Sequence, residues 1–232
     1  MSTKLDILVF GAHADDAEIG MAGTIIKHTS AGVRVGICDL TYAEMSSNGT
    51  VERRQQEAAA AAAVLGLSYR SNLGLPDRGL ERNAAQLAAI TAEIRRCAPR
   101  IVFAPYWEDR HPDHIWCSRL VEEAVFNAKL RRYMPELAPV QVEQLYYYFI
   151  NDTAPASVLV DVTAHYERKV DALSCYASQF GLAAGDDTVA TPLTQGYVER
   201  VRYRDAIAGQ RSMIPYAEGF VTKTPFVAER LL

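Results

Sequence analysis

The sequence predicts an α/β protein, a Rossmann-like three-layer sandwich in which helices cover both faces of a mainly parallel sheet. Short apolar runs alternate with longer segments of helical periodicity, and glycines follow the first two of those segments. Polar and acidic residues gather where two of the apolar runs end. Because ligands of such sheets bind beyond the carboxyl ends of the strands, we expect the functional site at that edge.

The first half of the chain alternates regularly between predicted strands and helices. Asp15 or Asp16 is the expected N-cap of the first helix, and Gly32 and Gly66 are the expected stops of the first two helices. The alanine-rich stretch 58–63 fits close packing of the second helix on the sheet. We expect strands at 6–12, 33–40, 69–73 and 101–105, and helices at 17–31, 50–65, 83–97 and 112–129.

Beyond residue 140 the regular alternation ends. A polar segment rich in Gly, Asp and Thr, 181–195, is expected to form a mobile loop over the site. No linker composition interrupts the chain, so residues 1–232 are expected to form a single domain. We expect strands at 144–150 and 157–162, and helices at 164–180 and 197–209.

Composition argues against several classes of protein. The 28 acidic and 24 basic residues give no positive field for nucleic acid. No stretch reaches the roughly 20 apolar residues of a membrane span, and the first residues lack the apolar core of a signal peptide, so we expect a cytoplasmic protein without a membrane partner. Cys38, Cys97, Cys117 and Cys175 form no C-x-x-C pair, which indicates reduced thiols rather than disulfides or a thiolate zinc site.

Two segments that carry histidines and carboxylates follow predicted strands far apart along the chain. They are His13-Ala14-Asp15-Asp16-Ala17-Glu18 and His111-Pro112-Asp113-His114. Crowded carboxylates at a strand end are costly to desolvate unless a cation is present, so the two segments predict one divalent metal held between them. A hydrolytic zinc site normally has three protein ligands, and His13, Asp16 and His114 supply that number and type.

Asp15 is the carboxylate left beside this predicted metal. Adjacent Asp15 and Asp16 cannot point the same way, so one ligates while the other can accept a proton from water. Coordination lowers the pKa of a bound water to about 7. An isolated Asp-Asp pair is more typical of a helix cap than of a metal site. The metal becomes the better interpretation only because the segment 111–114 also supplies histidines at a strand end. A dinucleotide site is disfavoured, because residues 11–18 contain no G-x-G-x-x-G and their carboxylates would repel a pyrophosphate.

His111 and His114 lie three residues apart at the predicted start of a helix and therefore share one face. Both imidazoles can reach the same pocket, so one can bind metal while the other forms a hydrogen bond to a reacting oxygen. Asp113 could orient His111 and raise its pKa, which would keep the ring protonated.

In these motifs the chain resembles the LmbE-like, or PIG-L, family of zinc-dependent N-acetylglucosamine deacetylases. The resemblance extends over essentially the whole length. Stretches 109–114 and 192–199 are similar to the branch that deacetylates N-acetylglucosaminyl-malate in bacillithiol biosynthesis. The motifs that carry the family resemblance are Ala12-His13-x-Asp15-Asp16-x-Glu18, Arg54-x-x-Glu57, Leu75-Pro76-Asp77 and His111-Pro112-Asp113-His114.

Carried over by position, the resemblance implies a complete catalytic site and a homo-oligomer, a hexamer in the family. One Zn²⁺ per chain is its implied cofactor. The implied roles are metal binding by His13, Asp16 and His114, general base catalysis by Asp15, acid catalysis by a cationic His111 backed by Asp113, and assistance to the oxyanion by Tyr197.

The resemblance also implies how substrate is held. Arg54 matches the family arginine that grips sugar or aglycone oxygens. A malate aglycone carries two carboxylates, which suit an arginine fork, and Arg54, Arg78 and Arg110 are the candidates. Asp77 could bind sugar hydroxyls. The expected partner is therefore a small N-acetylglucosaminyl substrate with an anionic aglycone.

The leading hypothesis is a zinc-dependent hydrolase that removes the N-acetyl group from N-acetyl-alpha-D-glucosaminyl L-malate. The alternative within the family is a deacetylase or amidase for another N-acylated glucosaminide, either chitooligosaccharide-like or a bacillithiol S-conjugate. A metal-dependent sugar-binding protein without turnover would not need Asp15. A magnesium-dependent phosphotransfer receiver domain would not need His13 or His114.

Overall fold

The computed structural model describes residues 4–181 and 188–225. Within these ranges, seven strands form one sheet in the order β3-β2-β1-β4-β5-β7-β6. The strands are β1 (Ile7–Gly11), β2 (Val35–Thr41), β3 (Tyr69–Leu75), β4 (Ile101–Pro105), β5 (Gln144–Tyr148), β6 (Val158–Asp161) and β7 (Ala217–Val221). The helices are α1 (Asp16–Ser30), α2 (Val51–Leu65), α3 (Ala84–Cys97), α4 (Pro112–Ala128), α5 (Tyr166–Ser174), α6 (Ala177–Phe180) and α7 (Tyr197–Gln210), with a 3-10 turn η1 (Thr163–His165) before α5.

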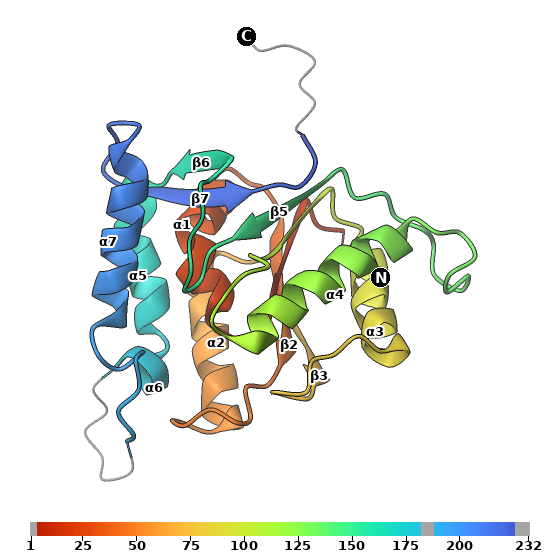
Figure 1. The fold of residues 1–232 in the computed structure, drawn as a ribbon, viewed down its shortest axis with the longest axis horizontal. Coiled ribbons are helices and arrows are strands. Elements are labelled where there is room, and N and C mark those ends of the chain that lie inside the picture. Colours follow the sequence, from red (N-terminus) through yellow and green to blue (C-terminus); the bar gives the residue numbers. More distant parts are fainter. Residues whose placement is uncertain (1–3, 182–187, 226–232) are drawn as a thin grey trace.

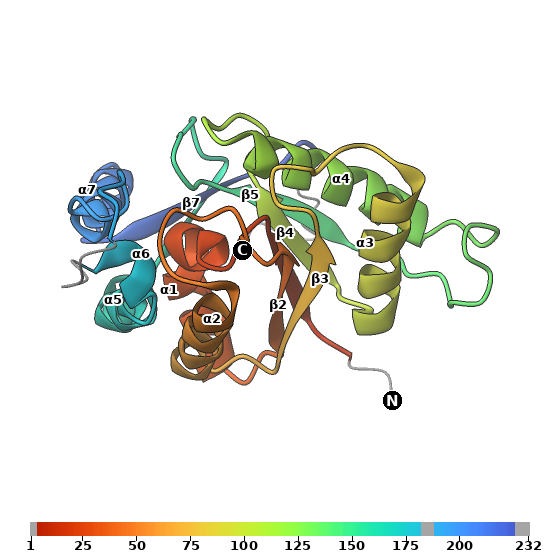
Figure 2. The same ribbon diagram turned by 90° about the horizontal axis from the view of Figure 1, so that it is seen from below.

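Helices cover both faces of the sheet, which confirms the predicted three-layer α/β sandwich (Figures 1 and 2). In Figure 2, α3 and α4 lie on one side of the strands, while α1, α2 and α5 lie on the other. The buried residues of β1 alternate between two apolar clusters, with Leu8 and Phe10 in one and Ile7 and Val9 in the other. A strand buried on both faces is typical of a parallel sheet between two helical layers.

The strand order reverses between β1 and β4. β1 pairs in parallel with β2 on one side and with β4 on the other, and the chain reaches β4 only after β2 and β3. The loops after β1 and β4 therefore diverge at the carboxyl edge, where open α/β sheets bind ligands. Segments 13–16 and 109–114 follow these two strands, so the fold brings both motifs to the same place.

The second half differs from the sequence prediction in two places, by one strand that the sequence does not predict and by one predicted helix that is divided. The sequence does not predict β7, which runs antiparallel between β5 and β6, because Glu218 and Gly219 interrupt its apolar run. The helix expected at 164–180 is divided into η1, α5 and α6. The division leaves Tyr176 outside the helices, where its buried hydroxyl donates a hydrogen bond to Glu18 Oε1 (2.7 Å).

The predicted bounds of α2, 50–65, are confirmed to within one residue, and so is the prediction of free cysteine thiols. Thr50 Oγ1 accepts a hydrogen bond from the backbone N–H of Arg53, and Gly66 ends α2 with φ of 69°, in the left-handed conformation that favours glycine. All four cysteines are free thiols, and three of them are buried.

Helix α1 is kinked at Met21, whose φ of −154° and ψ of 23° are not helical. A kink leaves backbone groups without partners inside the helix. Glu218 of β7 accepts hydrogen bonds from the N–H groups of Gly23 (2.9 Å) and Thr24 (2.6 Å). Arg204 of α7 donates to a carbonyl oxygen of the first half of the helix (2.7 Å). The C-terminal elements therefore cap both halves of α1.

A buried lysine connects these caps. Lys169 of α5 is fully buried, and its Nζ lies 2.8 Å from Asp205 Oδ2 and 2.6 Å from Glu218 Oε1. Arg204 also pairs with Asp205 (2.9 Å). Buried carboxylates are stable only with such partners, so this network fixes α5, α7 and β7 against the helix that begins at the candidate site.

We predict that Lys169→Met destabilises the protein strongly. The substitution leaves two buried carboxylates without their shared cation, and it should lower the free energy of unfolding by about 3–5 kcal/mol in urea denaturation. Arg82→Met is the control, because it breaks the exposed pair with Glu123 and should not move the urea midpoint. A Lys169→Met protein as stable as the parent would contradict the role of the network.

Candidate active site

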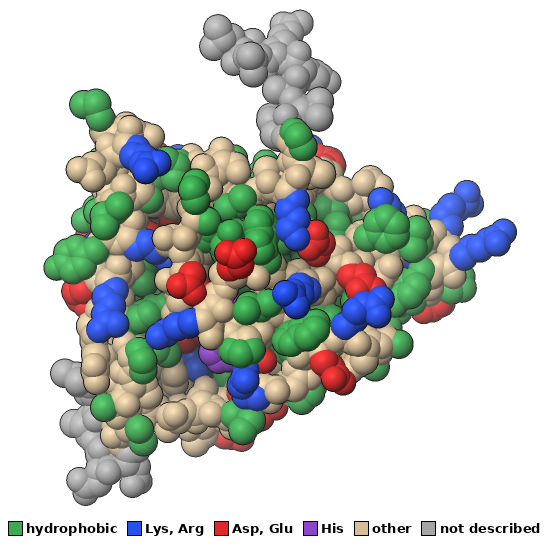
Figure 3. Space-filling model, in the orientation of Figure 1, with side chains coloured by type: hydrophobic (Ala, Val, Ile, Leu, Met, Phe, Trp, Pro, Cys, Tyr) green, Lys and Arg blue, Asp and Glu red, His purple; other side chains and the backbone are tan. Residues whose placement is uncertain are grey.

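The side chains that follow β1, β3 and β4 line one cavity of about 440 Å³. In Figure 3, a histidine is visible in a hollow beside lysine or arginine side chains. Of the predicted site residues, Asp113 alone is absent from the lining, which includes His13, Asp15, Asp16, Arg54, Asp77, Arg78, Arg110, His111, His114 and Tyr197. The fold thus assembles both motifs around one space.

The Asp16 carboxylate lies between the imidazoles of the two motifs. Its Oδ1 is 3.1 Å from His114 Nε2, and its Oδ2 is 3.6 Å from His13 Nδ1. The backbone N–H of His13 also donates to Oδ2 (2.9 Å). Burial alone would raise the pKa of Asp16, but the two imidazoles hold it well below its usual value. All three side chains are buried.

The opposite nitrogen of each ring contacts another carboxylate. His114 Nδ1 lies 2.9 Å from Asp109 Oδ1. His13 Nε2 lies 3.2 Å from Asp77 Oδ1 and 3.5 Å from Asp113 Oδ2. Metal-binding histidines typically donate their second N–H to a carboxylate, which fixes the tautomer and ring orientation. If the protons of the two rings are placed on His13 Nε2 and His114 Nδ1, the lone pairs of His13 Nδ1 and His114 Nε2 both face the Asp16 carboxylate. This donor set of two imidazoles and one carboxylate fits a divalent metal such as zinc.

The electrostatics of the site favour positive charge. Burial opposes protonation of His114, but the carboxylates of Asp16 and Asp109 raise its pKa to about 9. Burial likewise opposes protonation of His13, but hydrogen bonds to Asp113, Asp16 and Asp77 raise its pKa well above its usual value. The carboxylates that stabilise protonated imidazoles here would also stabilise a metal cation.

Two other groups of potential metal ligands converge on His13 among the described residues. They are His13, His111 and His114, and His13, Asp77 and Asp113, each with ligand atoms within 4.8 Å of one another. His111 Nδ1 accepts a hydrogen bond from the backbone N–H of Asp113 (3.2 Å), so a neutral ring carries its proton on Nε2. This tautomer makes His111 a hydrogen-bond donor toward the cavity rather than a metal ligand.

The predicted orientation of His111 by the Asp113 carboxylate is not seen among the hydrogen bonds of that carboxylate to the described residues. The Asp113 carboxylate accepts hydrogen bonds from the backbone N–H and guanidinium of Arg78 (2.9 and 3.3 Å). The backbone N–H of Asp113 donates a hydrogen bond to His111 Nδ1. Asp113 lies in the first turn of α4, where its N–H needs an acceptor outside the helix. Asp113 acts to raise the pKa of His111, as predicted, but burial of the ring and the neighbouring His114 and His13 outweigh it, so the net shift is downward.

Asp15 and Asp16 point apart, as predicted, but Asp15 does not cap α1 with its side chain. It occupies the N-cap position with φ of 124°, a strained conformation for a residue with a side chain. Its Oδ2 instead accepts a hydrogen bond from Arg54 Nη1 (2.7 Å). Burial raises the pKa of Asp15 to about 7, although Arg54 opposes the shift. A carboxyl group with such a pKa suits proton transfer near neutral pH.

Two of the three arginines predicted to bind the aglycone already have carboxylate partners. Arg54 is buried between Asp15 and the Ala14 carbonyl (2.9 Å), and Arg78 pairs with Asp113. The exposed Arg110 side chain has no hydrogen bond or ion pair to the residues that the structure describes. Substrate binding by these arginines stays a prediction.

The remaining predicted residues are held by neighbours. Asp77, expected to bind sugar hydroxyls, contacts His13 and accepts the backbone N–H of Met45 (2.9 Å). Tyr197 donates from its hydroxyl to Asn151 Oδ1 (2.9 Å), and burial raises its pKa, so the phenol stays protonated. Of the loop expected at 181–195, residues 182–187 lie outside the described residues, and Thr191, Pro192 and Leu193 line the cavity.

Asp109 and Asn151 are site residues to which the sequence assigns no role. Asn151 donates from its backbone N–H (3.0 Å) and its side chain (2.9 Å) to the Asp109 carboxylate, which also contacts His114. Burial opposes ionisation, but His114 lowers the pKa of Asp109 to about 2. A histidine that binds a metal usually donates its other ring N–H to a carboxylate, and this rule could have indicated Asp109 as the partner of His114. No sequence signal identifies Asn151, which follows β5.

Residues 8–125 match the PIG-L family, described as GlcNAc-PI de-N-acetylase. The chain belongs to the PIG-L family. This confirms the family resemblance, whereas the bacillithiol branch stays a prediction. A PIG-L relative, a diacetylchitobiose deacetylase from Thermococcus kodakarensis, is 30% identical over 189 residues, which are 75% of this chain and 70% of the relative.

Solved structures share the PIG-L fold. The conserved protein TT1542 from Thermus thermophilus is similar with a TM-score of 0.89 and 38% identity, over 98% of this chain and 99% of the other. The N,N'-diacetylchitobiose deacetylase from Pyrococcus horikoshii has a TM-score of 0.81 over 95% of this chain and 87% of the other, and at 24% identity it supports the fold alone. Within the described ranges, none of the helices could cross a membrane.

We predict that Asp109→Asn weakens zinc binding by about 10–100-fold, because an amide no longer fixes the His114 tautomer. His114→Ala should lose most of the bound zinc. Metal content after dialysis against a graded series of chelator concentrations measures both effects, and circular dichroism checks that the variants fold. His165→Ala, a histidine outside the cavity, is the matched control. Wild-type zinc retention by His114→Ala would rule out its ligation.

Proposed function

We propose that this PIG-L protein is a zinc-dependent hydrolase that removes the N-acetyl group from an N-acetylglucosaminyl conjugate. The observation that carries the proposal is the position of Asp15. This buried carboxyl group is held by Arg54 and lines the same cavity as the two-histidine, one-carboxylate set of His13, Asp16 and His114. A site that only bound a metal and a sugar would not need such a base.

Asp15 is the proposed general base. A metal held by the three ligands would supply a bound water of lowered pKa and polarise the amide carbonyl. Arg54 fixes Asp15 Oδ2, while Oδ1 has no hydrogen bond to any described residue and can accept the proton. Returning that proton to the amide nitrogen as the C–N bond breaks yields acetate and a free amine, so the carboxyl group ends the cycle as it began.

His111 is the proposed donor to the oxyanion. Its Nδ1 is occupied by the Asp113 N–H, so its Nε2–H is available to the carbonyl oxygen as the amide carbon becomes tetrahedral. Burial lowers the pKa of His111, which favours the neutral ring that donates from Nε2. Tyr197, a protonated phenol that lines the same cavity, is a second candidate donor.

Two classes of substrate are supported by different observations. The bacillithiol-like stretches at 109–114 and 192–199 favour the malate glycoside, for which the exposed Arg110 would be the free cation. The relationship to a diacetylchitobiose deacetylase favours an N-acetylated oligosaccharide of glucosamine as the second candidate.

We predict that the zinc-loaded protein releases acetate from one or both of N-acetylglucosaminyl-malate and diacetylchitobiose. Acetate release should stop after chelation and return when zinc is added. A preference for the malate glycoside over both diacetylchitobiose and free N-acetylglucosamine identifies the malate enzyme, and the reverse order identifies the oligosaccharide enzyme. Failure to release acetate from any of the three would contradict the proposed function.

We predict that Asp15→Asn lowers kcat by about 10²–10⁴-fold, because it removes the base and spares the three metal ligands. Zinc content should stay at the wild-type level. Asp6→Asn, which alters an exposed ion pair with Arg34, is the matched control and should keep full activity. Wild-type kcat in Asp15→Asn would refute the assigned role.

A further inference from the structure

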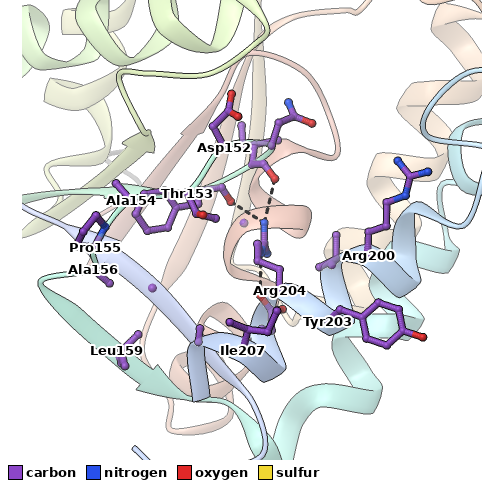
Figure 4. A pocket seen from close by; sticks show the side chains of 18 of the residues that line it. Asp152, Thr153, Ala154, Pro155, Ala156, Leu159, Arg200, Tyr203, Arg204 and Ile207 are labelled. Atoms are coloured by element: carbon purple, nitrogen blue, oxygen red, sulfur yellow. Dashed lines mark hydrogen bonds and ion pairs between the residues drawn. The ribbon is translucent and has the colours of Figure 1, made fainter. Parts of the chain in front are cut away.

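A second cavity, of about 930 Å³, adjoins the catalytic one. It lies between α7 and residues 149–159, which comprise the connection from β5 to β6 and the first two residues of β6 (Figure 4). The two cavities share the lining residues Arg110, Ile150, Asn151 and Tyr197. No step of the proposed hydrolysis uses this space. A group attached to the sugar in the catalytic cavity would extend past the shared residues into it.

One part of this second cavity is apolar. Tyr203 and Ile207 of α7 are 66% and 68% exposed, which is high for large apolar side chains. Figure 4 shows them on α7, across the pocket from Ala154, Pro155 and Leu159. Exposed apolar side chains gathered around a cavity mark a binding surface rather than a solvated face.

The other part of the lining is cationic. Arg204 is neutralised by Asp205 and donates to backbone carbonyl oxygens, so it is not free to bind a ligand. Arg110, Arg200 and Arg211 also line the cavity, and their side chains have no hydrogen bond or ion pair within residues 4–181 and 188–225. The lining contains two carboxylates, Asp152 and Asp205, and Asp205 is already paired with Lys169 and Arg204.

We propose that this second cavity is the aglycone subsite, and that it takes an aglycone with an apolar body and a carboxylate. The inference rests on the proposed deacetylation and departs from the two candidate substrates, because neither aglycone combines an apolar body with a carboxylate. A neutral sugar would form no ion pair with the exposed guanidinium groups of Arg110 and Arg200, whereas a small dicarboxylate would leave the apolar wall formed by Tyr203 and Ile207 in water. An aryl or alkyl carboxylate satisfies both parts of the lining.

Four glycosides of N-acetylglucosamine test the subsite: methyl, carboxymethyl, benzyl and 4-carboxybenzyl. The zinc-loaded protein should have its highest kcat/KM for the 4-carboxybenzyl glycoside. Arg200→Gln should reduce the preference for 4-carboxybenzyl over benzyl by about 10-fold, the loss expected for a charge-assisted hydrogen bond. Ile207→Ser should reduce the preference for 4-carboxybenzyl over carboxymethyl. Arg202→Gln, whose guanidinium faces Glu167 outside both cavities, is the control and should leave all four rates unchanged.

A binding measurement separates failure of the subsite from failure of the proposed function. The 4-carboxybenzyl glycoside of glucose has no acetyl group, and calorimetry should show that Arg200→Gln binds it about 10-fold more weakly than the wild type. Acetate release at equal kcat/KM from all four glycosides would overturn the subsite and leave deacetylation intact. Failure to release acetate from any of them, with Arg200-dependent binding of the probe, would overturn deacetylation and support the subsite.

A second copy of the chain is the competing occupant of this surface. Sedimentation velocity of the wild type and Ile207→Ser tests it. Dissociation of an oligomer by Ile207→Ser, together with no binding of the probe to the wild type, would assign the surface to self-association and overturn the proposal. Unchanged sedimentation together with probe binding would support it.

Discussion

The contact between Asp16 and two histidines is the constraint on which the site depends. Its carboxylate oxygens lie near His13 Nδ1 and His114 Nε2, at 3.6 and 3.1 Å, and so join the loops after β1 and β4. A buried carboxylate requires positive charge beside it, and the imidazoles supply that charge when protonated. The reversal of strand order between β1 and β4 brings these loops together, so topology and electrostatics act at one point.

Around this contact, residues from other elements hold the groups that do the chemistry. Asp77 and Asp109 contact the outer nitrogens of the two histidines, and Arg54 of α2 fixes Asp15. Farther away, the buried network around Lys169 caps the kinked helix that begins at Asp16. The site is therefore held in place by several elements, which suits a reaction that needs a base and a metal at fixed positions.

The parts of the fold and site that depend on local sequence could be predicted. Hydrophobic periodicity predicts the first four strands and helices, and strand ends predict where His13 and His114 meet. Choices among tertiary partners could not be predicted. Asp113 is only two residues from His111 in sequence, yet its carboxylate pairs with Arg78, which approaches from the turn after β3. The strand β7 could not be predicted because it contains Glu218, a charged residue typical of loops, which is buried here and caps α1.

The position of the metal tests this account most directly. Crystals of the zinc-loaded protein, measured on both sides of the zinc absorption edge, would locate the ion by its anomalous signal. The account predicts one ion bound by His13 Nδ1, Asp16 and His114 Nε2, with Asp15 beside it and not coordinated. An ion bound instead on the Nε2 side of His13, between Asp77 and Asp113, would contradict it.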